Sequence, residues 1–420
     1  MRLNKNEYIC ALDIGCSKLS AALAKVAKRE IREMVFEGIP AKGIRDGSAI
    51  DSIELIACIE RLMRALKAKS GVNVKCLLVN ISGRDIVTKH SRAIVPLAER
   101  GNKVITASDI RKANEQARIL GSSLDEEILH IIPSGYNVDF KNNVLNPVGL
   151  YGHRLEVDLY LVSARLSSLQ TLSRIVHQAG YEVKEVFFSG AATTAAVMEG
   201  QAREGLNIFC DIGRDITELM VFKDGLLRDI EILATGGDRM ALQLQEELKL
   251  PYELAEEIKK SYGLAADPRE IDPEKEILIK KNTFYKPIKQ RLVAEIVSAS
   301  AKSICLQVKE AVEKKLSCYE VNSFVLTGRA ALLEGFIELL EGTLSIPVRF
   351  GRITNPAVPP AIKENSELSG QRCLAYLTCI GMICAALQER MAAPPSGARP
   401  AGGALSRALQ RAKEIYQEYF

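Results

Sequence analysis

The sequence lacks the cysteine and histidine spacing of a zinc site. Its ten cysteines, among them Cys10, Cys58 and Cys210, form no CxxC pair, and none of the four histidines stands at a ligand spacing from a cysteine. Structural zinc sites depend on such spacing. Most of the cysteines lie in apolar runs, so we expect them to be small buried hydrophobic residues in a reducing compartment.

A strong charge surplus and long apolar runs are also missing. The net charge is only +4, and no basic run carries interleaved aromatic residues, so we expect no nucleic-acid partner. Residues 1–8 are polar and resemble no signal peptide. No apolar stretch reaches the roughly 18 residues that a spanning helix needs. We therefore expect a cytoplasmic chain without a transmembrane segment.

The composition that remains is typical of a globular protein with more than one domain. Hydrophobic residues make up 47% and charged residues 26% of the sequence. The chain of 420 residues is too long for one ordinary hydrophobic core. Two strand-turn-strand patterns stand half a chain apart. The first pairs Tyr8–Leu12 with Leu19–Val26, and the second pairs Leu206–Cys210 with Glu218–Phe222. This repetition predicts two related α/β halves that face each other across a cleft.

Periodicity places the other elements around these two patterns. Apolar spacing of three and four residues predicts helices, and a helix over 108–120 would begin with Ser108 as its N-cap. Asp224 and Gly225 predict a hairpin turn. The remaining predicted helices cover 53–70, 168–179, 253–262 and 292–316, and the remaining strands cover 76–81, 155–163, 226–233 and 324–328.

The two turns carry the pattern Asp-x-Gly, at Asp13 and Gly15 and again at Asp211 and Gly213. Glycine lets the backbone approach a phosphate closely, and successive N–H groups form a nest for an anion. Aspartate holds Mg²⁺ through its water shell. A single such turn also suits any tight hairpin, whereas two turns at matching places favour a nucleotide site. Gly328, which follows a strand, fits a contact with adenosine.

These turns resemble the phosphate and adenosine motifs of the actin and Hsp70 superfamily. Four other segments resemble the FtsA family, the actin-like bacterial cell-division proteins. Leu129–Asp139 and Asn146–Val157 are similar to the small subdomain found in FtsA and its near relatives. Gly43–Gly47 resembles the entry into the first helix, and Gly190–Ala195 the connecting helix below the cleft. The resemblance extends over almost the whole chain.

The resemblance implies an α/β, actin-like (ribonuclease-H-like, duplicated) two-domain fold with a small inserted α+β subdomain. The first half would comprise 1–85, completed by 164–203 and about 345–390. The inserted subdomain would cover 86–163. The second half would cover 204–344, with an outer subdomain at about 236–298. A flexible linker over 391–403 and an amphipathic helix over 404–420 would follow.

The function implied by the resemblance is that of a cell-division adaptor. Such a protein forms actin-like polymers on the cytoplasmic face of the inner membrane at the division site. It anchors the FtsZ ring there by binding the C-terminal peptide of FtsZ, through a surface within about 236–298, and contacts other division proteins. Two alternatives remain: a pilus-assembly actin-like protein with the same subdomain, and an active ATPase or sugar kinase of the superfamily. No sugar-kinase aspartate motif is present.

The implied cofactor is ATP with Mg²⁺, the metal having no direct protein ligand. Glu256 and Lys259 would lie near the adenine and ribose, although an ordinary solvated charge pair explains their spacing equally well. The implied cofactor-binding residues are Asp13, Gly15, Cys16, Ser17, Lys18, Asp211, Gly213, Thr217, Gly236, Gly237, Glu256, Lys259, Gly328 and Arg329.

Departures from the family pattern argue against strong nucleotide binding. The second turn of FtsA relatives usually reads Asp-Ile-Gly-Gly-Gly-Thr-Thr-Asp, but Arg214 and Asp215 replace two of these glycines here. Arg329 replaces a glycine of the adenosine turn, and Cys16 replaces a hydroxyl residue. We expect weak ATP binding and at most a weak ATPase, with no assigned catalytic base. Alternatively, the two arginines contact phosphate oxygens themselves, or they are surface arginines that close a disused cleft.

The C-terminal segment 404–420 resembles the membrane anchor of FtsA. A Pro/Gly/Ala-rich linker precedes it, and its apolar residues fall on one helical face. The alternative is a helix that packs back onto the protein or onto another subunit. The predicted membrane-binding residues are Leu405, Leu409, Ile415, Tyr416, Tyr419 and Phe420.

Overall fold

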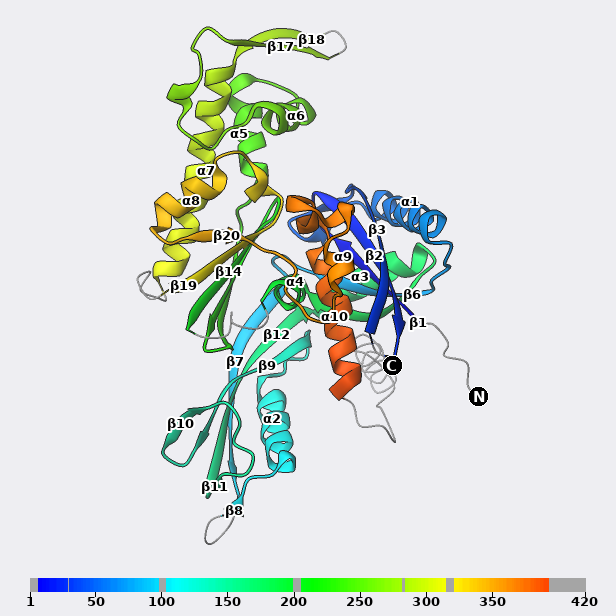
Figure 1. Cartoon of the computed structure of the whole chain (residues 1–420), viewed down its shortest axis with the longest axis vertical. Coiled ribbons are helices and arrows are strands. Elements are labelled where there is room, and N and C mark those ends of the chain that lie inside the picture. Colours follow the sequence, from blue (N-terminus) through cyan, green and yellow to red (C-terminus); the bar gives the residue numbers. More distant parts are fainter. Residues whose placement is uncertain are drawn as a thin grey trace.

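The structure, a computed structural model, describes residues 7–392 except 29, 98–102, 199–204, 282–283 and 315–320. The predicted membrane-binding helix and almost all of the predicted linker lie outside the described residues. The described part is elongated (Figure 1). Two five-stranded sheets occupy its middle, an outer subdomain lies at one end, and the inserted subdomain lies at the other.

The first half contains a sheet of order β13-β6-β1-β2-β3. Strands β1, β2 and β3 form an antiparallel meander. Strand β6 pairs parallel to β1, and β13 pairs parallel to β6. One helix, α1, begins at Asp51, whose side chain accepts from the N–H groups of Ile53 and Glu54, and ends at Gly71 in the left-handed region. The elements are β1 (Glu7–Ile14), β2 (Lys18–Ala27), β3 (Glu30–Pro40), α1 (Ser52–Ser70), β6 (Cys76–Ile81), α3 (Leu166–Gln178) and β13 (Glu182–Phe188).

The second half repeats this sheet as β16-β15-β14-β19-β20, again with three antiparallel strands and two parallel ones. The predicted duplication is therefore present strand for strand. Asp224 and Gly225 both have positive φ, as a tight hairpin requires. The elements are β14 (Leu206–Ile212), β15 (Thr217–Lys223), β16 (Leu226–Leu233), α5 (Asp238–Leu248), α6 (Tyr252–Tyr262), β17 (Glu276–Lys281), β18 (Phe284–Lys289), α7 (Gln290–Glu313), β19 (Val321–Thr327), α8 (Phe336–Leu344) and β20 (Val348–Phe350).

The inserted subdomain has its own sheet, β10-β9-β12-β7, and its own small core around Ala117, Leu159 and Leu161. Its helix begins at Thr106 rather than at the predicted Ser108. The Thr106 side chain accepts from the Asp109 N–H while Asp109 accepts from the Thr106 N–H, a complete capping box. The elements are β7 (Ile86–Pro96), β8 (Lys103–Val104), α2 (Ala107–Gly121), β9 (Glu126–Val138), β10 (Lys141–Val144), β11 (Tyr151–Gly152) and β12 (Arg154–Arg165).

Hydrogen bonds fix the inserted subdomain to strand β16 of the second half. The Ser134 hydroxyl donates to the Leu227 carbonyl at 3.1 Å, and Arg228 donates to the Ser134 carbonyl at 3.0 Å. The Tyr160 hydroxyl accepts from the Ile230 N–H at 2.9 Å. The subdomain therefore touches both halves of the molecule, because its chain leaves and re-enters the first half.

Two helices cross beneath the cleft, α4 (Ser189–Val197) and α10 (Leu377–Ala392). At their crossing, a Cβ on Gly381 would lie 1.7 Å from the Ala192 carbonyl oxygen, so only glycine fits there. Thr193 and Thr378 share a hydrogen bond of 3.0 Å. The remaining short elements are β4 (Ile44–Arg45), β5 (Ser48–Ala49), η2 (Pro268–Glu270), η4 (Ala330–Leu332), α9 (Pro360–Lys363), η5 (Ser366–Leu368) and η6 (Gly370–Ala375).

No helix in the described part of the chain is both long and apolar enough to span a membrane.

Candidate functional site

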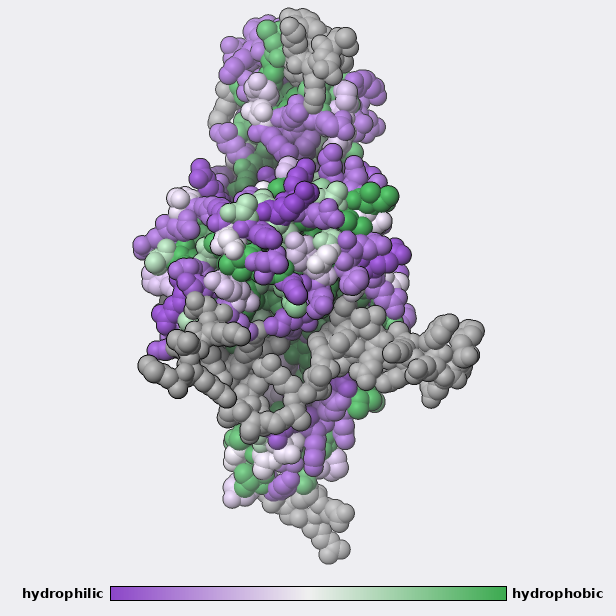
Figure 2. Space-filling view, turned by 90° about the vertical axis from the view of Figure 1, so that its right-hand side faces the viewer, coloured by the Kyte–Doolittle hydropathy of each residue, from purple (hydrophilic) through white to green (hydrophobic). Residues whose placement is uncertain are grey.

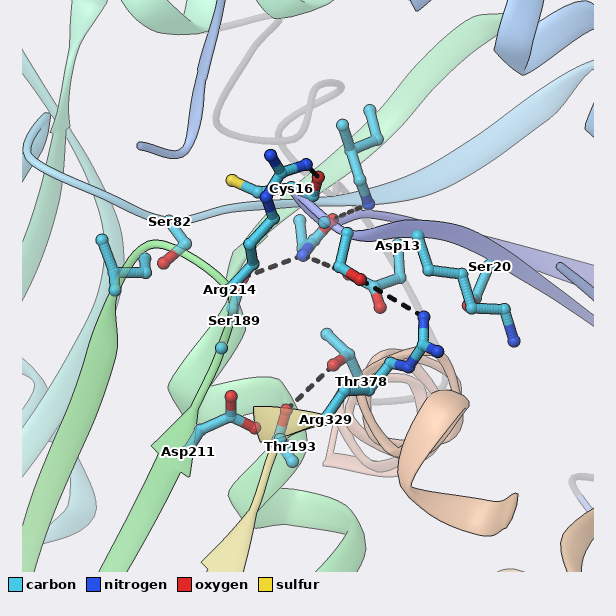
Figure 3. Close-up of a pocket in the computed structure, with 18 of the residues that line it drawn as sticks. Asp13, Cys16, Ser20, Ser82, Ser189, Thr193, Asp211, Arg214, Arg329 and Thr378 are labelled. Atoms are coloured by element: carbon cyan, nitrogen blue, oxygen red, sulfur yellow. Dashed lines mark hydrogen bonds between the residues drawn. The ribbon is translucent and has the colours of Figure 1, made fainter. Parts of the chain in front are cut away.

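The two Asp-x-Gly turns have the same geometry and face one cavity. The Gly15 N–H donates to the Lys18 carbonyl at 3.2 Å, and the Gly213 N–H donates to the Ile216 carbonyl at 2.9 Å. A Cβ at either glycine would lie 3.0 Å from that same carbonyl oxygen. Both turns line a cavity of about 130 Å³, which we call the inner cavity, at the base of the cleft (Figure 3).

Three carboxyl groups from the two halves approach one another in the inner cavity: those of Asp13, Asp211 and Glu218. Burial, followed by the charge of Asp211, raises the pKa of Asp13 to about 7. Burial and the same charge raise the pKa of Glu218 to about 8, and burial raises the pKa of Asp211. Three carboxylates this close cannot all ionise cheaply, so the cavity attracts protons or cations.

Neutral hydrogen-bond partners hold each of these carboxyl groups in place. Asn80 donates to Asp13 at 2.7 Å, and the Thr327 hydroxyl donates to Asp211 at 2.7 Å. The Ser82 hydroxyl of the first half donates to Glu218 of the second half. None of these partners carries a charge, so they do not offset the repulsion between ionised forms of the three carboxyl groups.

The donor set suits Mg²⁺ held through water molecules, because this ion prefers oxygen ligands and keeps much of its water shell. Within the described residues, no group of three or more His, Cys, Asp or Glu side chains is arranged to hold a metal directly. The charge of the cavity therefore fits the hydrated ion, while its volume does not fit a triphosphate. Ligand pockets usually measure about 300–1,000 Å³, well above the inner cavity.

Arg214 is one of the residues that line this small cavity. Its guanidinium donates to Asp238 at 3.1 Å, to the Tyr252 hydroxyl at 2.9 Å and, across the cleft, to the Cys16 carbonyl at 3.3 Å. Figure 3 shows the side chain lying beside Cys16. An arginine thus joins the two phosphate-type turns directly, in the space between them.

Asp215 and Arg329 form two further bridges between the halves. The Asp215 carboxylate accepts from the Asp46 N–H at 2.8 Å, and Arg329 donates to the Ser17 hydroxyl at 3.3 Å. Neither Arg214 nor Asp215 has positive φ, and Arg329 has φ −80°. The substitutions for glycine therefore cause no backbone strain. All three side chains instead connect the second half to the first.

Beside the inner cavity lies a larger pocket of about 390 Å³, which we call the side pocket, lined by Gly237, Met240, Glu256, Lys259 and Leu333 among others. Arg214 and Arg329 line both spaces and stand between them.

Glu256 and Lys259 form a partly buried pair rather than a solvated one. Their ion pair measures 2.5 Å, and their side chains are 20% and 13% exposed. Lys259 also donates to the Gly237 carbonyl at 3.1 Å, and burial lowers its pKa. Both side chains line the side pocket, where the resemblance places adenine and ribose.

Two of the predicted cofactor-binding residues do not reach either space. Thr217 is fully buried, and its hydroxyl donates to the Thr235 carbonyl at 2.8 Å. Gly236 packs against the second turn, where a Cβ would lie 2.4 Å from the Arg214 carbonyl oxygen. The N–H groups of Gly237 and Asp238 are also occupied, because they donate to carbonyls of that turn. The start of α5 therefore does not offer these groups to a phosphate.

The predicted residues of the two turns and Gly328 line the inner cavity, but their side chains and backbones make different contacts. Gly328 has φ +88° and packs against Ile212, where no side chain fits. The Cys16 thiol accepts from the Gly47 N–H at 3.2 Å, and burial raises its pKa to about 12, so it stays protonated. The Lys18 ammonium lies over the Tyr376 ring, 4.2 Å from the ring centroid.

Sequence reasoning missed the polar residues at the strand and helix ends around the cavity. Asn80 lies near the end of the apolar strand β6, and Ser82 follows this strand. Ser189 begins α4, and Thr378 lies near the start of α10. Asn80 donates to Ser189 and accepts from the Ile14 N–H. The sequence signal that could have identified this region was Asn80, an asparagine near the end of the apolar strand β6, because a buried amide needs hydrogen-bond partners.

The residues near the expected position of an attacking water are already bonded. Thr194 donates to the Gly190 carbonyl at 2.7 Å, and Thr193 pairs with Thr378. Neither threonine is a base that could activate water, and the carboxyl groups of Asp13, Asp211 and Glu218 line the same cavity.

Comparison with known proteins agrees with this geometry. The family model described as "SHS2 domain inserted in FTSA" matches residues 83–163, and the model "Cell division protein FtsA" matches residues 208–373. The chain is 29% identical over 348 residues to the cell division protein FtsA of Borreliella burgdorferi, covering 82% of this chain and 84% of that protein. It is 25% identical over 395 residues to the FtsA of Pseudomonas aeruginosa, covering 92% and 91%.

Solved structures give the fold. A structure of the PilM–PilN type IV pilus biogenesis complex aligns with a TM-score of 0.62 at 15% identity, covering 90% of this chain and 98% of that one. MreB5 of Spiroplasma citri bound to AMPPNP aligns with a TM-score of 0.51 at 10% identity, covering 92% and 98%. These two likenesses show the actin-like fold, and the matched family models and relatives show that the chain belongs to the FtsA family of cell-division proteins.

Proposed function

We propose that this protein is a cell-division adaptor that forms actin-like polymers on the cytoplasmic face of the inner membrane. At the division site it anchors the FtsZ ring by binding the C-terminal peptide of FtsZ, and it contacts other division proteins. Membership of the FtsA family supports this role. In this proposal the protein works as a scaffold, and ATP with Mg²⁺ binds weakly.

The observation that carries the proposal is the apolar surface of the inserted subdomain. More than half of the large hydrophobic side chains that the described residues expose lie in this subdomain, which makes up about a fifth of the chain. Phe140, at the turn between β9 and β10, is 99% exposed. Leu145 and Tyr151, farther along, are 60% and 69% exposed. The concentration of exposed hydrophobic side chains in one subdomain favours a contact with another protein subunit there.

The position of this surface favours assembly over chemistry. The subdomain forms the end of the molecule opposite the outer subdomain (Figure 1), and none of its residues lines the inner cavity. Figure 2 shows a largely hydrophilic face with hydrophobic residues in separate groups, some of them at this lower end. A contact at each end of an elongated subunit can repeat head to tail and generate a filament.

Electron microscopy of the protein on a lipid monolayer tests this role. Phe140→Ser should abolish or shorten the polymers, because a fully exposed phenylalanine contributes nothing to the isolated fold but about 1.5–3 kcal/mol when buried in a contact. Ile53→Ser, at an 80% exposed isoleucine of α1 in the first half, away from both ends, is the matched control and should leave the polymers unchanged. Normal polymers with Phe140→Ser, at an unchanged melting temperature, would remove this surface from the filament.

The closed cleft supports a scaffold rather than an ATPase. Arg214, Asp215 and Arg329 connect the two halves directly, as a bound nucleotide does when it contacts both turns. The closed arrangement therefore needs no ATP. Weak binding of ATP and little hydrolysis follow, because a triphosphate must first displace the arginines.

A further inference from the structure

The inserted subdomain exposes a second group of large apolar side chains, apart from those around Phe140. This group, which we call the α2 patch, consists of Ile119, Leu120 and Leu124, which are 57%, 70% and 85% exposed. We propose that the α2 patch binds the protein's own C-terminal segment, 404–420, whenever this segment is not on a membrane. The inference rests on the proposed membrane anchor and gives the anchor a second, competing binding surface.

The α2 patch lies at the end of the inserted subdomain that joins the first half. Directly after Leu124, the Asp125 carbonyl accepts from the N–H of Leu166 at 2.9 Å, and Leu166 begins α3 of the first half. Phe140 lies at the far end of the subdomain, beyond strand β9. The α2 patch is therefore separate from the proposed polymer contact, and it faces the region where the described chain ends.

Segment 404–420 can reach the α2 patch from the end of α10. Figure 1 shows α10 running from the cleft down to the level of α2. Helix α10 ends at Ala392, so the linker 393–403 connects it to the segment. An extended chain of this length spans roughly 36–40 Å, about as far as the 12-residue strand β12. Because the patch lies at the near end of the subdomain, the length of the linker does not limit the contact.

The two surfaces are complementary in chemistry. In a helix over 404–420 the apolar residues fall on one face, Arg411 and Lys413 stand at the two borders of that face, and both glutamates lie opposite. The α2 patch is followed directly by the acidic run Asp125–Glu127, in which Asp125 is exposed. An apolar face bordered by cations therefore meets an apolar patch bordered by carboxylates.

A weak contact is sufficient, because the segment and the patch belong to one chain. A short flexible linker gives an effective concentration on the order of 1 mM, so a dissociation constant of about 0.1–1 mM keeps the segment on the patch for about half to nine-tenths of the time. The apparent affinity of a single subunit for lipid then falls about two- to tenfold. Polymers still bind, because many segments act together.

Tryptophan fluorescence of the full chain tests this contact, because the sequence contains no tryptophan and Phe420→Trp adds a single reporter. In lipid-free protein at low concentration, we expect emission at a shorter wavelength, and weaker quenching by acrylamide, than in a peptide of residues 404–420 with the same substitution. Leu120→Ser combined with Leu124→Ser should return both readings to those of the peptide. Both leucines are exposed, so the melting temperature should stay unchanged.

Sedimentation with vesicles of phosphatidylglycerol and phosphatidylethanolamine supplies the second readout. With the segment released from the α2 patch, the double variant should bind these vesicles about two- to tenfold more tightly than the unaltered protein. Ile50→Ser combined with Ile53→Ser, at two isoleucines beside the start of α1 that are 69% and 80% exposed, is the matched control and should change neither readout. Deleting 404–420 should abolish vesicle binding in every variant.

The other outcomes separate this inference from the proposed anchor. Peptide-like emission from the lipid-free protein, or protection that survives in the double variant, would overturn the inference, while the anchor stands if the deletion still abolishes vesicle binding. Protection that grows with protein concentration would assign the contact to a second copy of the chain and overturn it as well. Weaker vesicle binding by the double variant would show that the α2 patch itself touches lipid. If the reporter is protected but no variant binds vesicles, the contact is confirmed and the anchor assignment fails.

Discussion

Removal of the Arg214 side chain should have opposite effects on stability and on ATP affinity. Arg214→Ala deletes the guanidinium that bonds to Asp238, to Tyr252 and, across the cleft, to the Cys16 carbonyl. Because the backbone at this position has no positive φ, alanine introduces no strain. Alanine and glycine should therefore affect ATP affinity alike, and any difference between them in stability reports only the flexibility of glycine.

The stability that Arg214→Ala loses depends on the two buried carboxylates that are left without their ion-pair partner. The side chains of Asp215 and Asp238 are only 5% and 10% exposed, and both face Arg214. Removing one partner of a fully buried ion pair costs about 3–5 kcal/mol. Arg214 is itself 26% exposed, so water screens part of the interaction. We expect the free energy of unfolding to fall by about 2–3 kcal/mol.

The affinity for ATP should rise instead, because the side chain no longer separates the inner cavity from the side pocket. We expect at least about tenfold tighter binding with Mg²⁺, equivalent to about 1.4 kcal/mol. The measurement is an ATP titration beside thermal melts with and without nucleotide, and ATP should restore part of the stability that the variant loses.

Arg84→Ala is the matched control for this pair of measurements. Arg84 lies close by and pairs with Asp46, but that pair is 68% and 40% exposed and lines no part of the inner cavity. The control should change stability by less than about 1 kcal/mol and leave ATP affinity unchanged. Weaker ATP binding by Arg214→Ala, or submicromolar binding by the unaltered protein, would refute the reasoning and make the arginine a phosphate ligand.

Four further predictions follow from other parts of the chain. The raised pKa of Glu218, about 8 against an ordinary 4.5, means that the folded state keeps a proton that the unfolded state releases. Its contribution to stability is present at low pH and lost as pH rises from about 4 to about 8. Glu218→Gln should raise the melting temperature at pH 8.5 more than at pH 5, and an equal shift at both would show that the carboxyl is ionised throughout. Gly381→Ala should lower the free energy of unfolding by at least about 3 kcal/mol in a denaturant titration, because α4 and α10 leave no room for a methyl group; an unchanged midpoint would contradict this crossing. Deleting 404–420 should release the protein from anionic liposomes in a sedimentation assay, and undiminished co-sedimentation would contradict the membrane-anchor assignment. Arg154→Glu, at a half-exposed arginine paired with Glu156 at 3.5 Å, should impair polymers on lipid without changing the melt, since a loss of about 0.2–1 kcal/mol recurs at every subunit; normal polymers would place Arg154 outside the interface.

Local sequence patterns predicted the two phosphate-type turns and the duplicated α/β halves. The two Asp-x-Gly turns stand between apolar strands, so Gly15 and Gly213 could be placed at the base of a cleft, and the structure gives both the same hydrogen bond. The duplication followed from the same two patterns. Such features depend on neighbours a few residues away, which a single sequence displays directly.

Features that depend on distant partners could not be predicted in this way. Lys18 lines the inner cavity, and its ammonium lies over the ring of Tyr376 in the space that Gly38 leaves free. The Thr217 hydroxyl donates to the Thr235 carbonyl inside the core, a contact between residues 18 positions apart. The replacement of glycine by Arg214 was visible in the sequence, whereas its bond to the Cys16 carbonyl depends on how closely the two halves approach.

The central claim is that side chains hold the cleft closed in place of a nucleotide, so that the protein is competent to assemble without ATP. Electron microscopy of the full chain on a lipid monolayer, after removal of nucleotide with apyrase and EDTA, tests this most directly. We predict polymers of the same length and number as those formed with ATP and Mg²⁺. Polymers that form only when ATP and Mg²⁺ are present would contradict the claim.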